Sequence, residues 1–595
     1  MTNETEKRSI GAEASPVSVP RRGGEPAGKW LKLLSWALVL LGVIHVEKAG
    51  ATGAQSYTVP TRDGLLPTDG VASNSHMATD GQGTVYVAWN DSSTAVEGRS
   101  LIVVSRSLDN GVSWGPAIRL NYLPQISGAQ QPHLACDQAG HAYVVWLDLT
   151  VLRFVSTSDW GETWTNPEVE ISVERTTSKM RPKMACDNAG NVVVGWEASD
   201  TQGEIHARSS HDFGASWDSD VAVLTPGNEE FHTAESLLTN GLGTFYMTWT
   251  GNTSLTTPAQ PQSATSHDGG RTWEPRVFAD GGTSLGAHQG AAAADSFGGL
   301  YFCWLEQIQE SSPTQGMFVS ASADAGASYD PQRLLLSDPN APPWVDQHSI
   351  ACDELGNVYV VWEAVYDPYS HVHLNRSRDG GRTWLPAPIR VDHSPAGTAD
   401  VSVCASSNGH VYVVWQDGRS GVDIFFNYST DFGETFQPID IRVDDPSRVD
   451  RFTTDVQILG DNRGYVHFSW DEAFSRPNVL YNRATPRLAI GLYPELGPAV
   501  VPAQGARVPV AAFVANGGTG PLPGLTAWID ATLPSGRTTR PAIGPFSFSL
   551  PAGREKTKPI SLRIPARLPA GLYQVHLRVD GPVCDRATMP FMKLP

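Results

Sequence analysis

Polar side chains recur at two places in this chain, directly before and directly after runs of apolar residues. A carboxylate follows seven similar runs that end in tryptophan, at Asp91, Asp148, Glu197, Glu306, Glu363, Asp417 and Asp471. Two carboxylates that flank a substrate can act as general acid and general base. Glu363 and Glu197 are therefore candidate catalytic residues, together with Asp346, which precedes a later apolar run. For Glu363 and Glu197, a solvated or hydrogen-bonded loop carboxylate is the alternative.

Three arginines could reach the same face as these carboxylates. They are Arg181, Arg419 and Arg451, and a planar guanidinium can hold a substrate carboxylate through two parallel hydrogen bonds. Arg419 lies between Asp417 and Asp423, so a local ion pair is its alternative role. We take these arginines as candidate ligand-binding residues.

His348 and Glu235 complete the candidate ligand-binding set. Asp346 and His348 are two residues apart, a spacing that places both side chains on one face of a strand. With His133 or His288 they could bind a divalent metal, but histidines that cap hydrogen bonds at the end of a strand are the favoured interpretation. The sequence indicates neither a metal site nor a cofactor.

Two repeated hairpins must position these side chains. A turn of the form Ser/Thr-x-Asp-x-Gly-x-Ser/Thr-aromatic occurs seven times between Ser107 and Phe436, at intervals of roughly 50–56 residues. A second hairpin, strand–turn–strand, ends in tryptophan eight times, at Trp89, Trp146, Trp196, Trp249, Trp304, Trp362, Trp415 and Trp470. Glycine gives each turn its positive φ, and the Asp and Ser/Thr side chains close it.

Two hairpins per repeat give four antiparallel strands, and such units repeated radially form a β-propeller. The count favours eight blades over residues 55–487, with seven blades and an irregular last unit as the alternative. The last unit lacks an outer strand, and we expect residues 56–61 to supply it and close the ring. The polar side chains would then gather at the opposite end of the blades from the seven turns.

The repeats stop near residue 488. Alternating runs at 508–516, 525–533, 546–550, 560–565 and 571–579 follow, separated by turns, which predicts a small β-sandwich over 488–595. Residues 1–54 hold a basic lead and an apolar run, 33–44, followed by small residues. This pattern is typical of a signal peptide, with an uncleaved N-terminal anchor as the alternative. We expect a secreted, periplasmic or cell-surface protein.

Charge and cysteine content exclude several classes of protein. The chain has 43 Lys and Arg against 62 Asp and Glu, a formal charge of −19. Such an acidic chain is unsuited to nucleic acid or to an anionic membrane, whose phosphates require cations. The six cysteines form no zinc-binding pattern, and Cys136, Cys186 and Cys352 occupy the same place in three repeats, as small buried side chains do.

The seven turns resemble the Asp-box, or BNR repeat, of the sialidase superfamily, and the tail resembles the immunoglobulin-like domains of many exported bacterial proteins. The resemblance implies a propeller with its ligand site at the end away from the Asp-boxes. In sialidases three arginines bind the substrate carboxylate, a tyrosine assisted by a glutamate is the nucleophile, and an aspartate is the acid/base. The usual Arg-Ile-Pro motif is absent near the first blade, where Arg62 stands in a different context, VPTRDG.

These observations predict an exported, sialidase-like propeller that recognises an extracellular carbohydrate or glycoprotein. Hydrolysis of that glycan, as a glycoside hydrolase of sialidase-like type, is an open question at this stage. The alternative is a non-catalytic surface protein that serves as an interaction platform for a protein partner. An association with membranes is expected only through an uncleaved N-terminal anchor.

Overall fold

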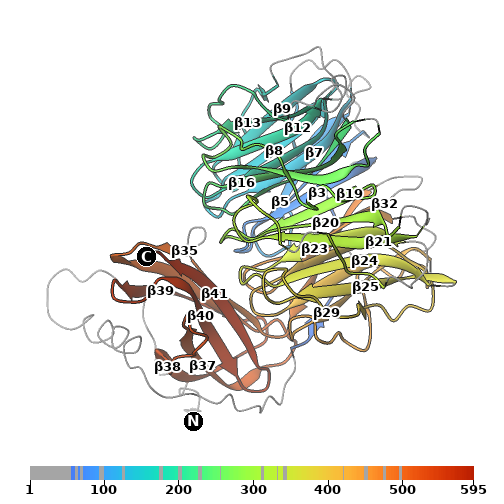
Figure 1. Ribbon diagram of the computed structural model, residues 1–595. Helices are drawn as coiled ribbons and strands as arrows, with labels where there is room; N and C mark the ends of the chain where they lie inside the picture. The colour runs from blue at the N-terminus through green and yellow to red at the C-terminus, as the bar shows by residue number, and fades with distance from the viewer. Residues whose placement is uncertain are drawn as a thin grey trace, which may run out of the picture. The chain divides into compact units, whose positions relative to one another are not determined.

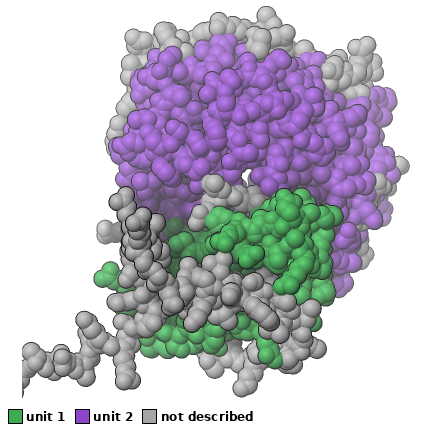
Figure 2. Space-filling model, turned by 90° about the vertical axis from the view of Figure 1, so that its left-hand side faces the viewer, with its two compact units in different colours: residues 1–58, 462–465, 484–595 green, residues 59–461, 466–483 purple. Residues whose placement is uncertain are grey.

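A computed structural model describes the chain from residue 55 to residue 595. Short gaps interrupt the described residues at 61–63, 67–70, 93–99, 123–127, 173–178, 199–203, 225–230, 255, 310–313, 331–332, 339–344, 367, 420, 448–452, 473–477 and 495–498. The chain divides into two compact units, coloured separately in Figure 2: residues 59–461 with 466–483, and residues 1–58 with 462–465 and 484–595.

The larger unit contains eight antiparallel sheets of similar build (Figure 1). In the first, β3 (Ala72–Thr79), β4 (Val85–Asp91), β5 (Leu101–Ser107) and β6 (Ile118–Arg119) lie side by side in chain order. We call such a sheet a blade and its first strand the inner strand.

The next six blades repeat this order. The second and third contain β7 (Ala129–Cys136), β8 (Ala142–Asp148), β9 (Val151–Thr157) and β10 (Val169–Glu170), then β11 (Lys179–Cys186), β12 (Val192–Ala198), β13 (Glu204–Ser210) and β14 (Val221–Leu224). The fourth and fifth contain β15 (Phe231–Thr239), β16 (Phe245–Asn252), β17 (Gln260–Ser266) and β18 (Val277–Phe278), then β19 (His288–Ala294), β20 (Leu300–Gln307), β21 (Gln315–Ser322) and β22 (Leu334–Leu335). The sixth and seventh contain β23 (Val345–Cys352), β24 (Val358–Tyr366), β25 (Tyr369–Ser377) and β26 (Ile389–Arg390), then β27 (Thr398–Ala405), β28 (Val411–Asp417), β29 (Asp423–Ser429) and β30 (Ile441–Arg442).

The second strand of each blade is buried on both faces. All seven residues of β8 are buried, and the eight repeated tryptophans are at most 1% exposed. Consecutive blades therefore pack against each other through apolar side chains on both faces of each sheet. The first hydrophobic cluster between blades joins Ala88 and Val104 of the first blade to Leu134 and Val144 of the second.

The eighth blade closes the ring. Its strands are β31 (Thr453–Gly460), β32 (Val466–Glu472) and β33 (Asn478–Pro486). Inner strand β3 contacts both β7 and β31, so the eight inner strands form a closed series around one axis. This confirms the eight-bladed propeller.

The start of the chain supplies the outer edge of the eighth blade, as predicted, but through two short strands. β1 (Tyr57–Thr58) pairs with Pro486 and Thr485, at the far end of β33. β2 (Gly64–Leu65) pairs with Tyr481 and Leu480, in the middle of β33, where outer strands pair in the other blades. Residues 56–61 are thus only part of the closing segment.

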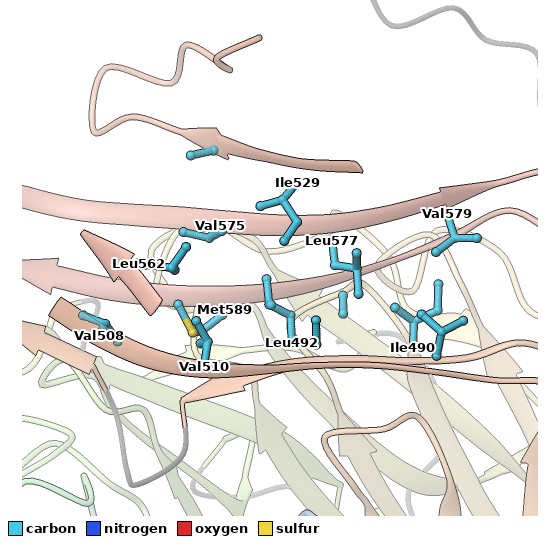
Figure 3. Packing of buried hydrophobic residues seen from close by; sticks show 14 of the residues in the cluster. Ile490, Leu492, Val508, Val510, Ile529, Leu562, Val575, Leu577, Val579 and Met589 are labelled. Atoms are coloured by element: carbon cyan, nitrogen blue, oxygen red, sulfur yellow. The ribbon is translucent and has the colours of Figure 1, made fainter. Parts of the chain in front are cut away.

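The C-terminal residues form a β-sandwich, as predicted. One sheet has the order β34 (Ala489–Pro494), β36 (Gly505–Ala515) and β39 (Glu555–Pro565). The other has the order β35 (Ala499–Val501), β41 (Asp585–Lys593), β40 (Gly571–Asp580), β37 (Leu522–Thr532) and β38 (Ile543–Leu550). Side chains of both sheets share one core, in which Leu492 and Val510 face Ile529 and Leu577 (Figure 3). The sequence prediction missed β34, β35 and β41.

Other expectations concern targeting and cysteines. The expected signal peptide lies outside the described residues. Among the described residues, no helix is long and apolar enough to cross a membrane. All six cysteines are free thiols.

Candidate functional site

The two ends of each blade are built differently. In each of the seven Asp-box turns, a backbone N–H next to the aspartate donates to a glycine carbonyl in the turn between the first and second strands. Examples are Asn110 to Gly83 and Trp160 to Gly140, both at 2.9 Å. Each Asp-box joins the third strand of its blade to the fourth. These hydrogen bonds place it at the end of the blade where the first strand turns into the second. The inner strands begin at the opposite end, which we call the open end.

The Asp-box aspartates are occupied by their own turns. Asp379 Oδ1 accepts hydrogen bonds from Thr383 N and Ser377 Oγ, both at 2.8 Å, and Oδ2 accepts one from Thr383 Oγ1 at 2.6 Å. Partial burial raises the pKa of Asp379, but these hydrogen bonds outweigh it and lower the pKa overall. The other six boxes repeat this pattern, so these aspartates stabilise turns and do not form a site.

Every inner strand carries a β-bulge near the open end. The register against the second strand shifts in all eight, as between Ser73 and His76 in β3. In seven of them a non-glycine residue at the bulge has a positive φ: Asn74, Gln131, Arg181, Gln289, Gln347, Asp400 and Asp455. All seven are polar or charged, and all but Asp400 are exposed. We call them the bulge residues.

Such a ring is unusual because a positive φ strains residues other than glycine, asparagine and aspartate. Bulges redirect side chains and occur often beside active sites. In β15 the unpaired residue is Glu235, whose φ is not positive. Eight strands thus present eight polar groups at one end of the molecule.

Side chains of one blade fix the bulge of the next. Arg181 N donates to Gln131 Oε1 at 3.4 Å, and Val456 N donates to Asp400 Oδ2 at 3.1 Å. Residues after the repeated tryptophans act in the same way: Asn90 Nδ2 donates to the carbonyl of Ala129 at 2.9 Å. The ring is therefore preorganised by contacts between neighbouring blades.

One side of the open end carries paired cations and carboxylates. Arg181 Nη1 lies 3.6 Å from Glu197 Oε2, and the Arg181 side chain is 46% exposed. Burial lowers the pKa of Lys183, which lies near Glu235 and Arg181. Burial likewise raises the pKa of Glu235, whose Oε1 accepts a hydrogen bond from Thr250 at 2.8 Å. The structure thus brings together three of the predicted site residues, Arg181, Glu197 and Glu235.

The other side of the open end is acidic. Asp346 and Glu363 are directly opposite each other on β23 and β24, and Glu363 is buried while Asp346 is exposed. Burial raises the pKa of Glu363 to about 7, and the charges of Asp346 and Asp400 add to the shift. Burial also raises the pKa of Asp471 to about 7. A buried, protonatable carboxyl beside an exposed one is an arrangement suited to acid–base chemistry.

Arg419 does not join this site. Its Nη2 lies 2.6 Å from Asp417 Oδ2 and 2.7 Å from Asp440 Oδ2, and its guanidinium lies over the ring of Phe425. The expected local ion pair is confirmed with Asp417, while Asp423 pairs with Arg442. These contacts do not support Arg419 as a ligand-binding residue, because the two buried carboxylates already use its Nε and Nη2 donors.

Arg451 lies outside the described residues. A clamp of three arginines is therefore not found among the described residues, where Arg181 alone of the candidates is exposed at the open end.

Asp346 and His348 do not share a face, contrary to the sequence prediction. Gln347 is a bulge residue, so Asp346 pairs with Glu363 while His348 pairs with the adjacent Trp362. Adjacent residues on a strand point to opposite faces, which separates the two side chains. Burial and the neighbouring His288 lower the pKa of His348 to about 4. The described residues contain no group of three or more His, Cys, Asp or Glu that could hold a metal ion.

Sequence reasoning missed Asn74 and Gln347 as members of the ring. The available signal was positional: each of the seven bulge residues lies one to four places before a buried apolar residue of its own inner strand. The bulge itself has no sequence signature comparable to the Asp-box.

No protein-family model and no curated protein matches this sequence. Among solved structures, the chain is similar to an ulvan lyase of a new polysaccharide lyase family, at 10% identity and a TM-score of 0.41 over 61% of this chain and 95% of that chain. It is similar to the BP39L lectin from Burkholderia pseudomallei, at 12% identity and a TM-score of 0.40 over 62% of this chain and 99% of that chain. A mutant NanB sialidase from Streptococcus pneumoniae has 12% identity and a TM-score of 0.33 over 73% of this chain and 95% of that chain.

Sialidases are thus among the similar structures, as the seven turns predicted, and the others include a glycan-acting enzyme and a lectin. The similarity concerns the fold. Identities and TM-scores this low carry no inference about the activity of this chain, which has to come from its own residues.

Proposed function

We propose that this protein is an exported glycan-binding propeller that receives its ligand at the open end. The observation that carries the proposal is the ring of bulge residues, which the inner strands hold at positive φ with six of the seven polar side chains exposed to solvent. Amide, guanidinium and carboxylate groups together suit the hydroxyls of a saccharide, which both donate and accept hydrogen bonds. The bulges are built before the ligand arrives, which lowers the entropic cost of binding.

Binding to the bulge residues can be tested without unfolding the protein. Gln289 and Gln347 are exposed and have φ of 50° and 32°, so glycine fits both positions. We expect the Gln289→Gly/Gln347→Gly double variant to bind glycans at least tenfold more weakly than the wild type on an array of extracellular glycans. The matched control is Asn110→Gly, which changes a polar residue of similar φ, 58°, at the Asp-box end.

Unchanged binding by the double variant would remove the open end as the glycan site. No binding of the wild type to any arrayed glycan would favour the non-catalytic platform for a protein partner. Equal losses in the double variant and in Asn110→Gly would indicate a general loss of structure.

A second candidate function, hydrolysis of the bound glycan, is favoured by Glu363 and Asp346. Glu363 would donate its proton to the glycosidic oxygen, and the Asp346 carboxylate would act as base or nucleophile. A clamp of the sialidase type is not part of this proposal because Arg419 is engaged elsewhere.

Hydrolysis is tested with fluorogenic glycosides, including sialosides. If Glu363 is the acid, turnover should fall as pH rises through about 7, and Glu363→Gln should lose at least a hundredfold in kcat. The absence of turnover on all substrates would leave the protein a binding module. Turnover that survives in Glu363→Gln would exclude this residue as the acid.

A further inference from the structure

The position between Asp and Gly in the Asp-box is occupied by aromatic residues in three of the seven turns. Trp160, Phe213 and Phe432 have φ of 56°, 61° and 62° there. A bulky side chain at such a φ is a genuine outlier. The equivalent residues are Asn110, Gly269, Ala325 and Gly380, which form the same turn with small or permissive side chains. The turn itself therefore does not require an aromatic ring.

Trp160 of the second blade and Phe213 of the third blade both lie at the turn between β7 and β8; we call the two rings the strip. The Trp160 ring lies flat on Gly140, where an added Cβ would come within 2.7 Å of the indole. The Phe213 ring lies on Gly190 and stacks on His141, with ring centroids 4.2 Å apart and 24° between the planes. Since Gly140 and His141 are adjacent in the chain, both rings rest on the same turn. Trp160 is 47% exposed and Phe213 is 37% exposed.

The third aromatic residue at this position, Phe432, has its ring covered by an arginine of the same chain. It lies on Gly409 in the same manner, but the Arg378 guanidinium stands 4.5 Å above it. Arg378 is in turn hydrogen-bonded to Glu434 at 3.4 Å. Within the described part of the chain, no cation or second ring covers Trp160, and its indole N–H has no hydrogen-bond partner. One face of that ring and one polar donor are therefore left for something outside the chain.

We propose that Trp160 and Phe213 form a second saccharide-binding surface, at the Asp-box end of the propeller and separate from the open end. The C–H face of a pyranose would lie on the exposed Trp160 ring and contact the exposed part of Phe213, and the indole N–H of Trp160 would donate to a sugar hydroxyl. Strained turns hold both rings at fixed orientations, so little side-chain entropy is lost on binding. A neutral saccharide fits better than an anionic one because the chain carries a formal charge of −19 and an Asp-box carboxylate adjoins each ring.

Native affinity electrophoresis of the full chain tests this surface. The gels contain neutral polysaccharides: a β-glucan, a galactomannan and an arabinan. Because the open end is itself proposed to bind glycans, each variant is also made in the Gln289→Gly/Gln347→Gly background. Retardation in that background then reports on the second surface alone, whichever way the test of the open end turns out.

The informative variant is Trp160→Asn/Phe213→Asn, since asparagine already occupies this position in the first Asp-box. We expect its apparent affinity for the polysaccharide, measured from the retardation, to be at least tenfold lower. Its melting temperature should stay within a few degrees of the wild-type value. Phe432→Asn is the matched control, because its ring is already covered by Arg378, and it should leave retardation unchanged.

Three results would overturn the proposal. They are no retardation of the parent background by any of the polysaccharides, wild-type retardation by the Asn/Asn variant, and an equal loss in Phe432→Asn. Sedimentation velocity tests whether the strip is instead a contact between two copies of this chain. Self-association that the Asn/Asn variant abolishes, together with no retardation by the polysaccharides, would assign the strip to that protein contact.

Discussion

At the scale of single residues, charge pairing decides which groups remain free for a ligand. Arg419 and Arg181 look alike in the sequence, yet Arg419 is enclosed by two carboxylates whereas Arg181 is half exposed beside one. Asp417 and Asp440 are buried, so each needs a cation or several donors to stay ionised. The arginine between them is structural for that reason.

The first prediction concerns this ion pair. Arg419→Ala leaves two buried carboxylates without their shared cation, so we expect the free energy of unfolding to fall by about 3 kcal/mol. Denaturant titration of the propeller transition measures it. The control is Arg382→Ala, an exposed arginine that donates to the carbonyl of Asp379, where the loss should stay below about 0.5 kcal/mol. Equal effects of both variants would contradict the structural role of Arg419.

At the scale of elements, local patterns were readable from the sequence and contacts between blades were not. The Asp-box and the tryptophan hairpin are formed by residues close in the chain, so their number predicted eight blades and placed the Asp-boxes away from the polar end. The bulge at Gln347 depends on pairing between β23 and β24. Periodicity alone therefore placed Asp346 and His348 on one face, which was wrong.

The second prediction concerns an Asp-box as an element. Asp324 accepts hydrogen bonds from Ser328 N at 2.8 Å, Ser328 Oγ at 2.5 Å and Ser322 Oγ at 2.8 Å. Asp324→Ala should cost about 1–2 kcal/mol of unfolding free energy, as the loss of a capping carboxylate does, and should leave glycan binding at the open end unchanged. Asp330→Ala changes an exposed aspartate just outside the same box and serves as the control. Impaired glycan binding in a folded Asp324→Ala protein would mean that the two ends are coupled.

At the scale of the whole molecule, contacts between consecutive blades stabilise the propeller, and the first described strands of the chain complete its eighth blade. Each blade packs on the next through buried second strands, and β2 completes the eighth blade on β33. The closed ring places the starts of the eight inner strands around one axis, so their eight bulges lie at one end of the propeller. The pKa values of Glu363 and Asp471 at that end are raised, whereas the pKa values of the Asp-box aspartates at the other end are lowered.

The third prediction uses this opposition. Burial raises the pKa of Glu363 and of Asp471 to about 7, so between about pH 4 and pH 7 the folded state binds more protons than the unfolded state, and stability falls as pH rises. In the Asp-boxes, hydrogen bonds outweigh partial burial and lower the pKa, to about 2 for Asp159, so that contribution is present above about pH 4 and is lost as pH falls. The buried histidines His76, His348 and His373, whose pKa burial lowers to about 4, act in the opposite sense between about pH 4 and pH 6.5, so the contribution of the two carboxyls is measured against a variant that lacks them.

Denaturant titrations from pH 2 to pH 8 measure this profile. The Glu363→Gln/Asp471→Asn variant removes these two carboxyls while keeping similar side-chain volumes, so its stability relative to the wild type should increase between pH 5 and pH 8. Each proton bound in excess by the folded state accounts for about 1.4 kcal/mol per pH unit, which makes the difference measurable. The acid limb, to which the Asp-boxes contribute, should be the same in both proteins. The same change in stability from pH 5 to pH 8 in both proteins would contradict the burial of protonated carboxyls at the open end.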